Sequence, residues 1–275
     1  MIKLKRKATG DAVALLQELL NESGYDLLVT STFGQATDGA VRDFQAQNGL
    51  ISDGVVYTKT WTKLLSRTPV DLNTIEARFL QEKDVLALAK TLSLESAVIK
   101  AVNEIESSGR GFLVDGRPKI LFEGHIFWRE LAKRGIDPAP LAVGHETVLY
   151  QASSRKHYLG GKREYDRLDE AIGLKNSADV AEAAYASASW GAFQIMGYHY
   201  AAMGYTDMVQ FVGDMKESEG SHLRVFGKFL IANNLVSFLK SKDWAAFAER
   251  YNGKGFRENK YDEKMAKAYE KYRVV

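Results

Sequence analysis

Short stretches of apolar residues at helical spacing, most of them closed by a glycine, recur along the chain. Residues 11–25 place leucines three and four positions apart on one helical face, and Gly24 is positioned to end that helix. Residues 37–49 repeat the plan, and Thr37 is expected to be the N-cap. This periodicity predicts a mainly α fold.

Composition removes several classes of protein. The chain has no cysteine, which excludes structural disulfides, thiol nucleophiles and cysteine-ligated zinc. A formal net charge of +2 argues against nucleic acid as a partner. No apolar run approaches the roughly 18 residues of a transmembrane helix, so no membrane span is expected. The basic start has no uninterrupted apolar core, and we expect no signal peptide.

The pattern changes after the first third of the chain. Residues 1–66 hold three expected helices, the third beginning near Thr58, and form a unit of barely self-supporting size. Residues 67–84 contain a proline and no sustained period, and are predicted to be a linker. Residues 85–275 are predicted to form a second, larger helical domain.

Residues 9–65 resemble the peptidoglycan-binding domain of the first type, found on many cell-wall hydrolases. The LQ, FG, T-x-x-AV-x-x-FQ, GL-x-x-DG and TW elements follow one another in the family's order. One departure is the pair Ser31 and Thr32, where the family usually has Asp-Gly. Phe44 and Trp61 are expected in the core, where they would hold the helices that shape a glycan groove.

Two acids close the next amphipathic stretch, for which Ser93 is the expected N-cap. Glu104 and Glu106 lie on opposite margins of its apolar face, so the pattern alone does not choose between them. Glu106 is nearer the helix end that Gly109 terminates, where the negative pole disfavours a carboxylate and raises its pKa. The alternative is that both acids are ordinary solvent-facing side chains without a catalytic role.

A second resemblance separates the two acids. The stretch "IESSGRGF" resembles the Glu-Ser motif that ends the catalytic helix of goose-type lysozymes and lytic transglycosylases. Two further elements, "SWGAFQIMG" and "RYNGKGF", follow in the expected order. Residues 85–273 look like the N-acetylmuramidase domain of bacteriophage endolysins. The resemblance implies a lysozyme-like domain in which Glu106 protonates the glycosidic oxygen.

The same motifs suggest substrate-binding residues. Gln194 is a polar side chain in an apolar motif, and its amide is expected to meet either backbone groups or the acetamido group of a sugar. Tyr251 and Asn252 are expected to align the substrate and Glu106. Trp190 is a candidate for the wall of a sugar-binding groove, with core packing as the equal alternative.

Glycoside cleavage commonly uses a second carboxylate beside the proton donor. Glu123 follows the short apolar run "KIL", which is expected to be a strand, and is the preferred candidate. Asp115 precedes a glycine in a turn signature, and forming that turn is its structural alternative. Goose-type relatives often lack an obvious second carboxylate, so neither acid need be essential.

Other chemistries lack their motifs. The five histidines show no helical metal-ligand spacing, and there is no nucleophile elbow or phosphate-binding loop. We therefore expect no metal and no cofactor.

The predicted function is cleavage of the β-1,4 bond between N-acetylmuramic acid and N-acetylglucosamine by a monomeric endolysin. Its partner would be the peptidoglycan glycan strand. It would be made in the host cytoplasm and act on the wall in the periplasm of a Gram-negative host. Two alternatives stay open at this point: a lytic transglycosylase that gives 1,6-anhydro products, and a non-catalytic wall-binding or virion protein.

Overall fold

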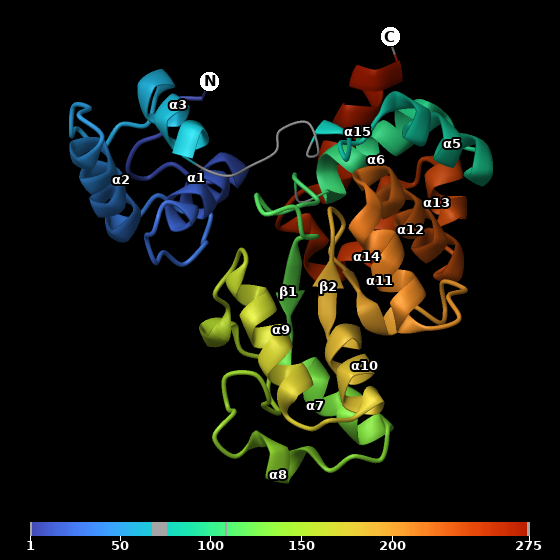
Figure 1. Ribbon diagram of the computed structural model, residues 1–275. Helices are drawn as coiled ribbons and strands as arrows, with labels where there is room; N and C mark the ends of the chain where they lie inside the picture. Colours follow the sequence, from blue (N-terminus) through green and yellow to red (C-terminus); the bar gives the residue numbers. More distant parts are fainter. Residues whose placement is uncertain (1, 68–75, 108, 274–275) are drawn as a thin grey trace. The chain divides into compact units, whose positions relative to one another are not determined.

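The computed structural model describes residues 2–67, 76–107 and 109–273 (Figure 1). The chain divides into two compact units, each built from two stretches of sequence. The first comprises Met1–Glu76 and Phe112–Ala184, and the second comprises Ala77–Gly111 and Tyr185–Val275. Helices dominate both units, which confirms the mainly α prediction. No helix of the described residues is long and apolar enough to cross a membrane.

Three helices form the N-terminal part of the first unit: α1 (Asp11–Glu22), α2 (Gln35–Gln47) and α3 (Thr58–Arg67). Their apolar faces meet in one core that includes Leu16, Phe44 and Trp61. The Trp61 indole also donates to the carbonyl of Ile2 at 2.8 Å, which ties α3 to the start of the chain. Phe44 and Trp61 are thus core residues, as the sequence predicted.

The expected cap of α2 is wrong. The helix begins at Gln35, two residues before Thr37, and Thr37 is buried with its hydroxyl accepting from the Gln17 amide at 3.0 Å. The Gln17 carbonyl oxygen accepts from the backbone N–H groups of Thr30 and Ser31. A buried glutamine amide therefore fixes the loop in which the sequence departs from the family pattern.

The remainder of the first unit surrounds a short strand. Its elements are β1 (Ile120–Phe122), α7 (Gly124–Lys133), α8 (Pro138–Ala142), η1 (Arg155–His157), α9 (Arg163–Gly173) and the start of α10 (Ala178–Ala186). The strand lies where the "KIL" run predicted it, directly before Glu123. α9 packs beside β1 (Figure 1).

A buried ion pair fastens α9 to β1. Glu164 and Arg167 lie one turn apart on α9, with side chains 0% and 4% exposed, and pair at 2.8 Å. The Glu164 carboxylate also accepts from the Phe122 N–H at 3.1 Å. The Arg167 guanidinium donates to the carbonyls of Phe122 at 2.8 Å and Thr147 at 3.0 Å. Both charges are therefore compensated inside the unit.

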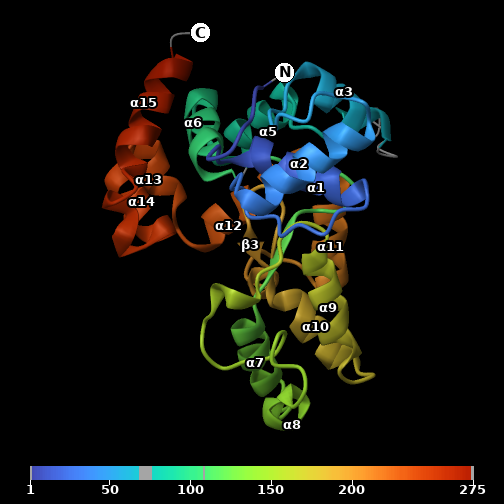
Figure 2. The same cartoon turned by 90° about the vertical axis from the view of Figure 1, so that its left-hand side faces the viewer.

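The second unit is helical with one small hairpin. Its elements are α5 (Glu82–Leu92), α6 (Ser96–Glu106), β2 (Ala188–Trp190), β3 (Ile195–Met196), η2 (Gly197–His199), α11 (Met208–Glu217), α12 (Glu219–Ala232), α13 (Val236–Ser241), α14 (Trp244–Asn252), η3 (Lys254–Arg257) and α15 (Tyr261–Arg273). β2 pairs with β3 in antiparallel register, Ser189 opposite Met196. α6 packs along α15, as both views show (Figures 1 and 2).

Ser93 does not start a helix but ends one. It adopts the left-handed conformation, φ 52°, as the C-cap of α5, and α6 begins three residues later at Ser96. The predicted linker, residues 67–84, lies partly outside the described residues, at 68–75. α5 begins at Glu82, inside that range.

A neutral histidine lies in the core of the second unit. His222 of α12 is 1% exposed and accepts from the N–H of Ala192 through Nδ1, while Nε2 donates to the carbonyl of Met215 at 2.7 Å. A Cβ atom on Gly111 would lie 2.5 Å from this ring, and one on Gly191 would lie 2.8 Å from it. Both positions therefore require glycine. Burial lowers the pKa of His222 to about 4.

The ion pair of α9 generates a stability prediction. Replacing Arg167 with methionine leaves the Glu164 carboxylate buried without its cation, which should lower the free energy of unfolding by roughly 3–5 kcal/mol. Urea unfolding followed by circular dichroism measures the change. Lys271→Met removes a cation from an ion pair that stands in solvent, and should leave the midpoint where it was. Equal losses for the two variants would contradict this assignment.

Candidate active site

Glu106 is the last residue of α6, where the helix ends at Ser107. The carbonyl end of a helix carries partial negative charge and disfavours a carboxylate. Oε2 of Glu106 accepts a hydrogen bond from Nδ2 of Asn252, at the end of α14, at 2.9 Å. Oε1 is shielded from solvent and has no hydrogen-bond partner among the described residues. The two predicted residues Glu106 and Asn252 are therefore in direct contact.

The surroundings of Glu106 favour its protonated form. Burial raises the pKa of this carboxyl to about 7, against a smaller opposing effect of the hydrogen bond from Asn252. A carboxyl group that still holds its proton near neutral pH is able to act as a general acid.

Glu104 has the opposite environment. Two positions earlier on α6, its carboxylate accepts from Lys271 Nζ at 2.7 Å and from the Tyr272 hydroxyl at 2.6 Å. These two hydrogen bonds, that of Lys271 first, lower the pKa of Glu104. It is an exposed, ionised side chain that ties α6 to α15. The two acids that the helical pattern left equivalent are thus different in protonation.

Tyr251 stands beside this pair in an aromatic cluster. Its ring stacks on Phe247 at 5.6 Å and meets the edges of Phe226 and Phe229 at 5.7 and 5.9 Å. Burial, and then the negative charge of Glu106, raises the pKa of the Tyr251 phenol. The cluster holds the end of α14, and therefore Asn252, in place.

In the second unit, the motif "SWGAFQIMG" forms the hairpin of β2 and β3, and the contacts of its side chains explain its residues. Gln194 has φ 49°, its Oε1 accepts from the Ser189 hydroxyl at 2.9 Å, and its Nε2 donates to the carbonyl of Gly191 at 2.8 Å. The amide of Gln194 thus bonds groups of the protein itself, which is the first of the two alternatives that the sequence left open. Trp190 is 0% exposed, donates to the carbonyl of Tyr185 and packs edge-on against Phe211. Trp190 is a core residue and not part of a groove wall.

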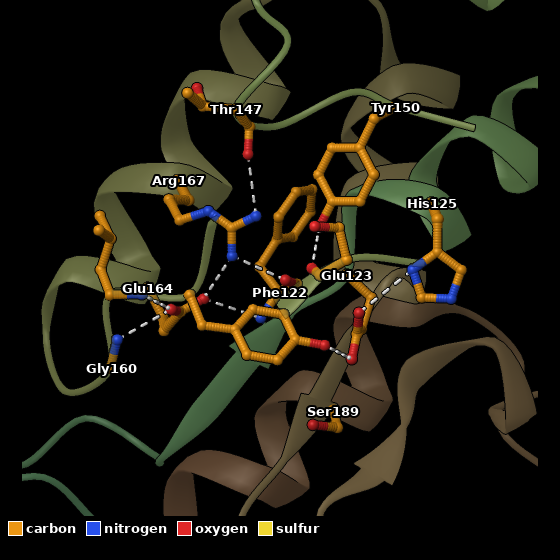
Figure 3. A network of polar contacts seen from close by, with 12 residues as sticks. Phe122, Glu123, His125, Thr147, Tyr150, Gly160, Glu164, Arg167 and Ser189 are labelled. Carbon is orange, nitrogen blue, oxygen red and sulfur yellow. Dashed lines mark hydrogen bonds and ion pairs between the residues drawn. The ribbon is translucent and has the colours of Figure 1, made fainter. Parts of the chain in front are cut away.

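Glu123 belongs to the first unit, at the N-terminus of α7. Its Oε1 accepts from the Tyr158 hydroxyl at 2.6 Å, and its Oε2 lies 3.2 Å from Nδ1 of His125 (Figure 3). The Glu123 side chain is 16% exposed. The hydrogen bond from Tyr158 restrains the orientation of this carboxylate, and Oε2 is buried without a hydrogen-bond partner among the described residues.

The carboxylate of Glu164 holds the backbone next to both Glu123 and Tyr158. Glu164 accepts from the N–H of Phe122, which precedes Glu123, and from the N–H groups of Leu159 and Gly160, which follow Tyr158 (Figure 3). The buried ion pair therefore holds both partners of the Tyr158–Glu123 hydrogen bond.

Asp115, also in the first unit, makes a turn. Its Oδ1 accepts from the Arg117 N–H at 3.0 Å and its Oδ2 pairs with the Arg117 guanidinium at 2.7 Å. Gly116 between them has φ 81°, which only glycine adopts easily. Asp115 thus forms the turn, which is the structural role that the sequence left open for it.

Sequence reasoning missed Tyr158, Glu164 and Arg167. Glu164 and Arg167 stand in "KREYDR", a run whose charge suggests a solvated helix face, and only the fold reveals that two of these side chains are buried. Among the described residues, no group of three or more acidic or histidine side chains is arranged to hold a metal ion.

Two family models and solved structures match the chain. The family model of the N-acetylmuramidases matches residues 95–273, and that of a putative peptidoglycan-binding domain matches residues 9–64. The chain is also similar to the crystal structure of a Burkholderia AP3 phage endolysin. The two chains are 38% identical, the match covers 100% of each, and the TM-score is 0.69. The chain therefore belongs to the N-acetylmuramidase family and is a lytic peptidoglycan hydrolase, a glycoside hydrolase that carries a peptidoglycan-binding domain.

Proposed function

We propose that Glu106 is the general acid that protonates the glycosidic oxygen between N-acetylmuramic acid and N-acetylglucosamine. The observation that carries this assignment is its burial at the end of α6, which raises the pKa to about 7. Asn252 holds one carboxyl oxygen and leaves the other to carry the proton. The leaving sugar receives that proton as the C–O bond breaks, so that no alkoxide has to form.

Tyr251 and Asn252 act with Glu106 as positioning residues. The aromatic cluster around Tyr251 fixes the end of α14, and the amide of Asn252 orients the Glu106 carboxyl. For Gln194 we propose a shaping role, in which its amide keeps the turn after β2 in the conformation that the hairpin presents to substrate. The side chain of Trp190 supports this hairpin from the core.

Glu123 is the proposed second carboxylate, ahead of Asp115. Hydrolysis requires that a water molecule lose a proton as it attacks the anomeric carbon, and an oriented carboxylate accepts that proton. The hydroxyl of Tyr158 provides the orientation at Glu123, and His125 lies 3.2 Å from its other oxygen. The carboxylate of Asp115 is instead engaged by Arg117 within its own turn. Attack by water leaves a reducing N-acetylmuramic acid end, and not a 1,6-anhydro end.

The biological setting is proposed on the same basis. Similarity to a phage endolysin along the full chain supports a role in lysis of an infected Gram-negative host, with the wall in the periplasm as the target. We propose that residues 1–66 bind the wall, that residues 67–84 are the linker, and that residues 85–275 form the domain that cleaves the glycan strand. The protein would act as a monomer on the glycan strand, and its near-neutral net charge of +2 supports no role for nucleic acid.

The first test separates the two acids of α6. Glu106→Gln keeps the hydrogen bond to Asn252 but removes the transferable proton, and should slow release of reducing ends from purified peptidoglycan on the order of 10³-fold. Glu104→Gln, the matched control on the same helix, should stay within about threefold of the parent because it only weakens an exposed contact. The assignment fails if Glu104→Gln is the inactive variant.

The second test concerns stability and pH. The Glu106 carboxyl has a pKa of about 7 in the fold and an ordinary value of 4.5, so ionisation costs the folded state free energy as pH rises through this range. Glu106→Gln should therefore be more stable than the parent at pH 8, by on the order of 3 kcal/mol. Below pH 4.5 the difference should vanish. Thermal unfolding at several pH values measures it, and a difference independent of pH would refute the burial of a titrating group.

The third test concerns the second carboxylate and the product. Glu123→Gln should cost on the order of 10²-fold in rate if this carboxylate accepts the proton of water. Asp115→Asn is the matched control and should cost under about threefold. Mass analysis of digested peptidoglycan should show ends that borohydride reduces with the addition of two hydrogens. Exclusively anhydro ends, each lighter by one water, would make the enzyme a lytic transglycosylase.

A further inference from the structure

Three acids spaced four residues apart in the peptidoglycan-binding domain each meet a group from residues 112–184 of the same unit. The pairs are Glu18 with the N–H of Val114 at 3.3 Å, Glu22 with Lys162 at 2.8 Å, and Asp26 with Arg163 at 2.8 Å. Two of these acids lie one turn apart on α1, and the third follows the helix. One side of the binding domain therefore carries a row of negative charge that matches cations near α9.

The two cations stand where a helix does not favour them. Lys162 is the N-cap of α9 and Arg163 is its first residue. The positive pole of a helix disfavours cations, so their partners on the binding domain offset a local cost. Exposed ion pairs contribute little to stability. They select which surfaces meet, and closer contacts have to hold the surfaces together.

Those closer contacts involve the backbone. The N–H of Val29 donates to the carbonyl of Leu159 at 3.1 Å. A Cβ atom on Gly160 would overlap the Val29 carbonyl, and one on Gly161 would lie 2.8 Å from a Val29 methyl group. The buried side chain of Val114 belongs to the same hydrophobic core as the three helices of the binding domain. The binding domain is therefore docked on this part of the unit and not merely tethered to it.

The docked loop also carries a residue of the candidate active site. The carbonyl of Leu159 meets the binding domain, whereas its N–H donates to Glu164 of α9 at 2.7 Å. Tyr158, the residue before, donates its hydroxyl to Glu123 at 2.6 Å. The loop that presents Tyr158 is thus held from two sides, by α9 and by the binding domain.

We propose that the peptidoglycan-binding domain is a positioning element for bond cleavage, in addition to being a wall anchor. By docking on residues 159–163 it fixes the hydroxyl of Tyr158 and, through it, the carboxylate of Glu123. The inference rests on the proposed function, in which Glu123 accepts the proton of the attacking water. Undocking leaves the loop held by α9 alone, and a loosely placed base lowers the rate even when the substrate is bound.

The experiment uses the full-length chain and short soluble peptidoglycan oligomers, whose cleavage does not require attachment to the wall. Val29→Arg places a long charged side chain against the glycine pair and should lower kcat about tenfold with little change in KM. That factor is the scale of one hydrogen bond to a charged group. Leu28→Arg is the matched control, because it adds the same charge one residue earlier, at a side chain that is 48% exposed. It should cleave like the parent.

A charge exchange provides a second, milder perturbation with a built-in rescue. Glu22→Lys alone and Lys162→Glu alone each place like charges together and should each lower kcat about threefold. The double variant restores an ion pair of opposite polarity and should regain the parental rate. Absence of rescue would show that the contact between these two side chains does not matter for cleavage.

The coupling to Tyr158 distinguishes positioning from general destabilisation. Tyr158→Phe removes the hydrogen bond to Glu123 and should itself lower kcat about tenfold. In that background Val29→Arg should cost nothing further, because the contact through which docking acts is already lost. An equal loss from Val29→Arg in both backgrounds, or a parental rate for Val29→Arg alone, would overturn the proposal.

Hydrogen exchange of the segment 158–164 reports docking without reference to activity. Exchange should be faster in Val29→Arg than in Leu28→Arg, and equal exchange would contradict the docking. Glu123→Gln tests the proposed base separately. A rate for Glu123→Gln within about threefold of the parent would remove the base, whereas an inactive Glu123→Gln beside a fully active Val29→Arg would overturn the positioning role alone.

Discussion

Burial of one carboxyl group at the end of α6 is the constraint on which acid chemistry in the second unit depends. Placing Glu106 at the negative end of a helix and away from water is unfavourable for its charged form. The packing of α6 against α15 keeps the group there, and Asn252 at the end of α14 donates a hydrogen bond to it. A fully satisfied carboxylate in this position would have lost its proton, and with it the capacity for acid chemistry.

Glu123 has different support. The Tyr158 hydroxyl donates to one of its oxygens, and a buried ion pair on α9 holds the backbone at Phe122 and at Leu159. The two glutamates thus differ in their partners: Glu106 meets the amide of Asn252 at the end of a helix, and Glu123 meets a tyrosine hydroxyl at the start of α7.

The sequence predicted the helical class, the strand before Glu123 and the contact between Glu106 and Asn252, the first two by periodicity and the third by resemblance. It placed two helix starts wrongly. Thr37 and Ser93 carry hydroxyls typical of N-caps, but Thr37 is bound by the buried Gln17 amide and Ser93 ends α5 in a left-handed conformation. Local propensity does not register such tertiary contacts.

The same limit explains the missed residues. Gln17 and Gln45 look like ordinary helical polar residues, yet each is 1% exposed and fixes a loop of the peptidoglycan-binding domain. Glu164 and Arg167 look like a solvated charge pattern and are the buried support of β1. Period and composition identify which face of a helix is apolar, but not which polar side chain is enclosed when two elements meet.

His222 and Glu106, both in the second unit, have a joint consequence for proton uptake. Near pH 5.5 the unfolded chain carries an ionised Glu106 and a protonated His222, given their ordinary pKa values of 4.5 and 6.5. In the fold, with values of about 7 and about 4, the carboxyl holds the proton and the imidazole is neutral. Folding therefore moves a proton, in effect, from a histidine to a glutamate with almost no net exchange with solvent. The loss of stability that Glu106 causes as pH rises and the loss that His222 causes as pH falls therefore oppose each other between pH 4 and 7.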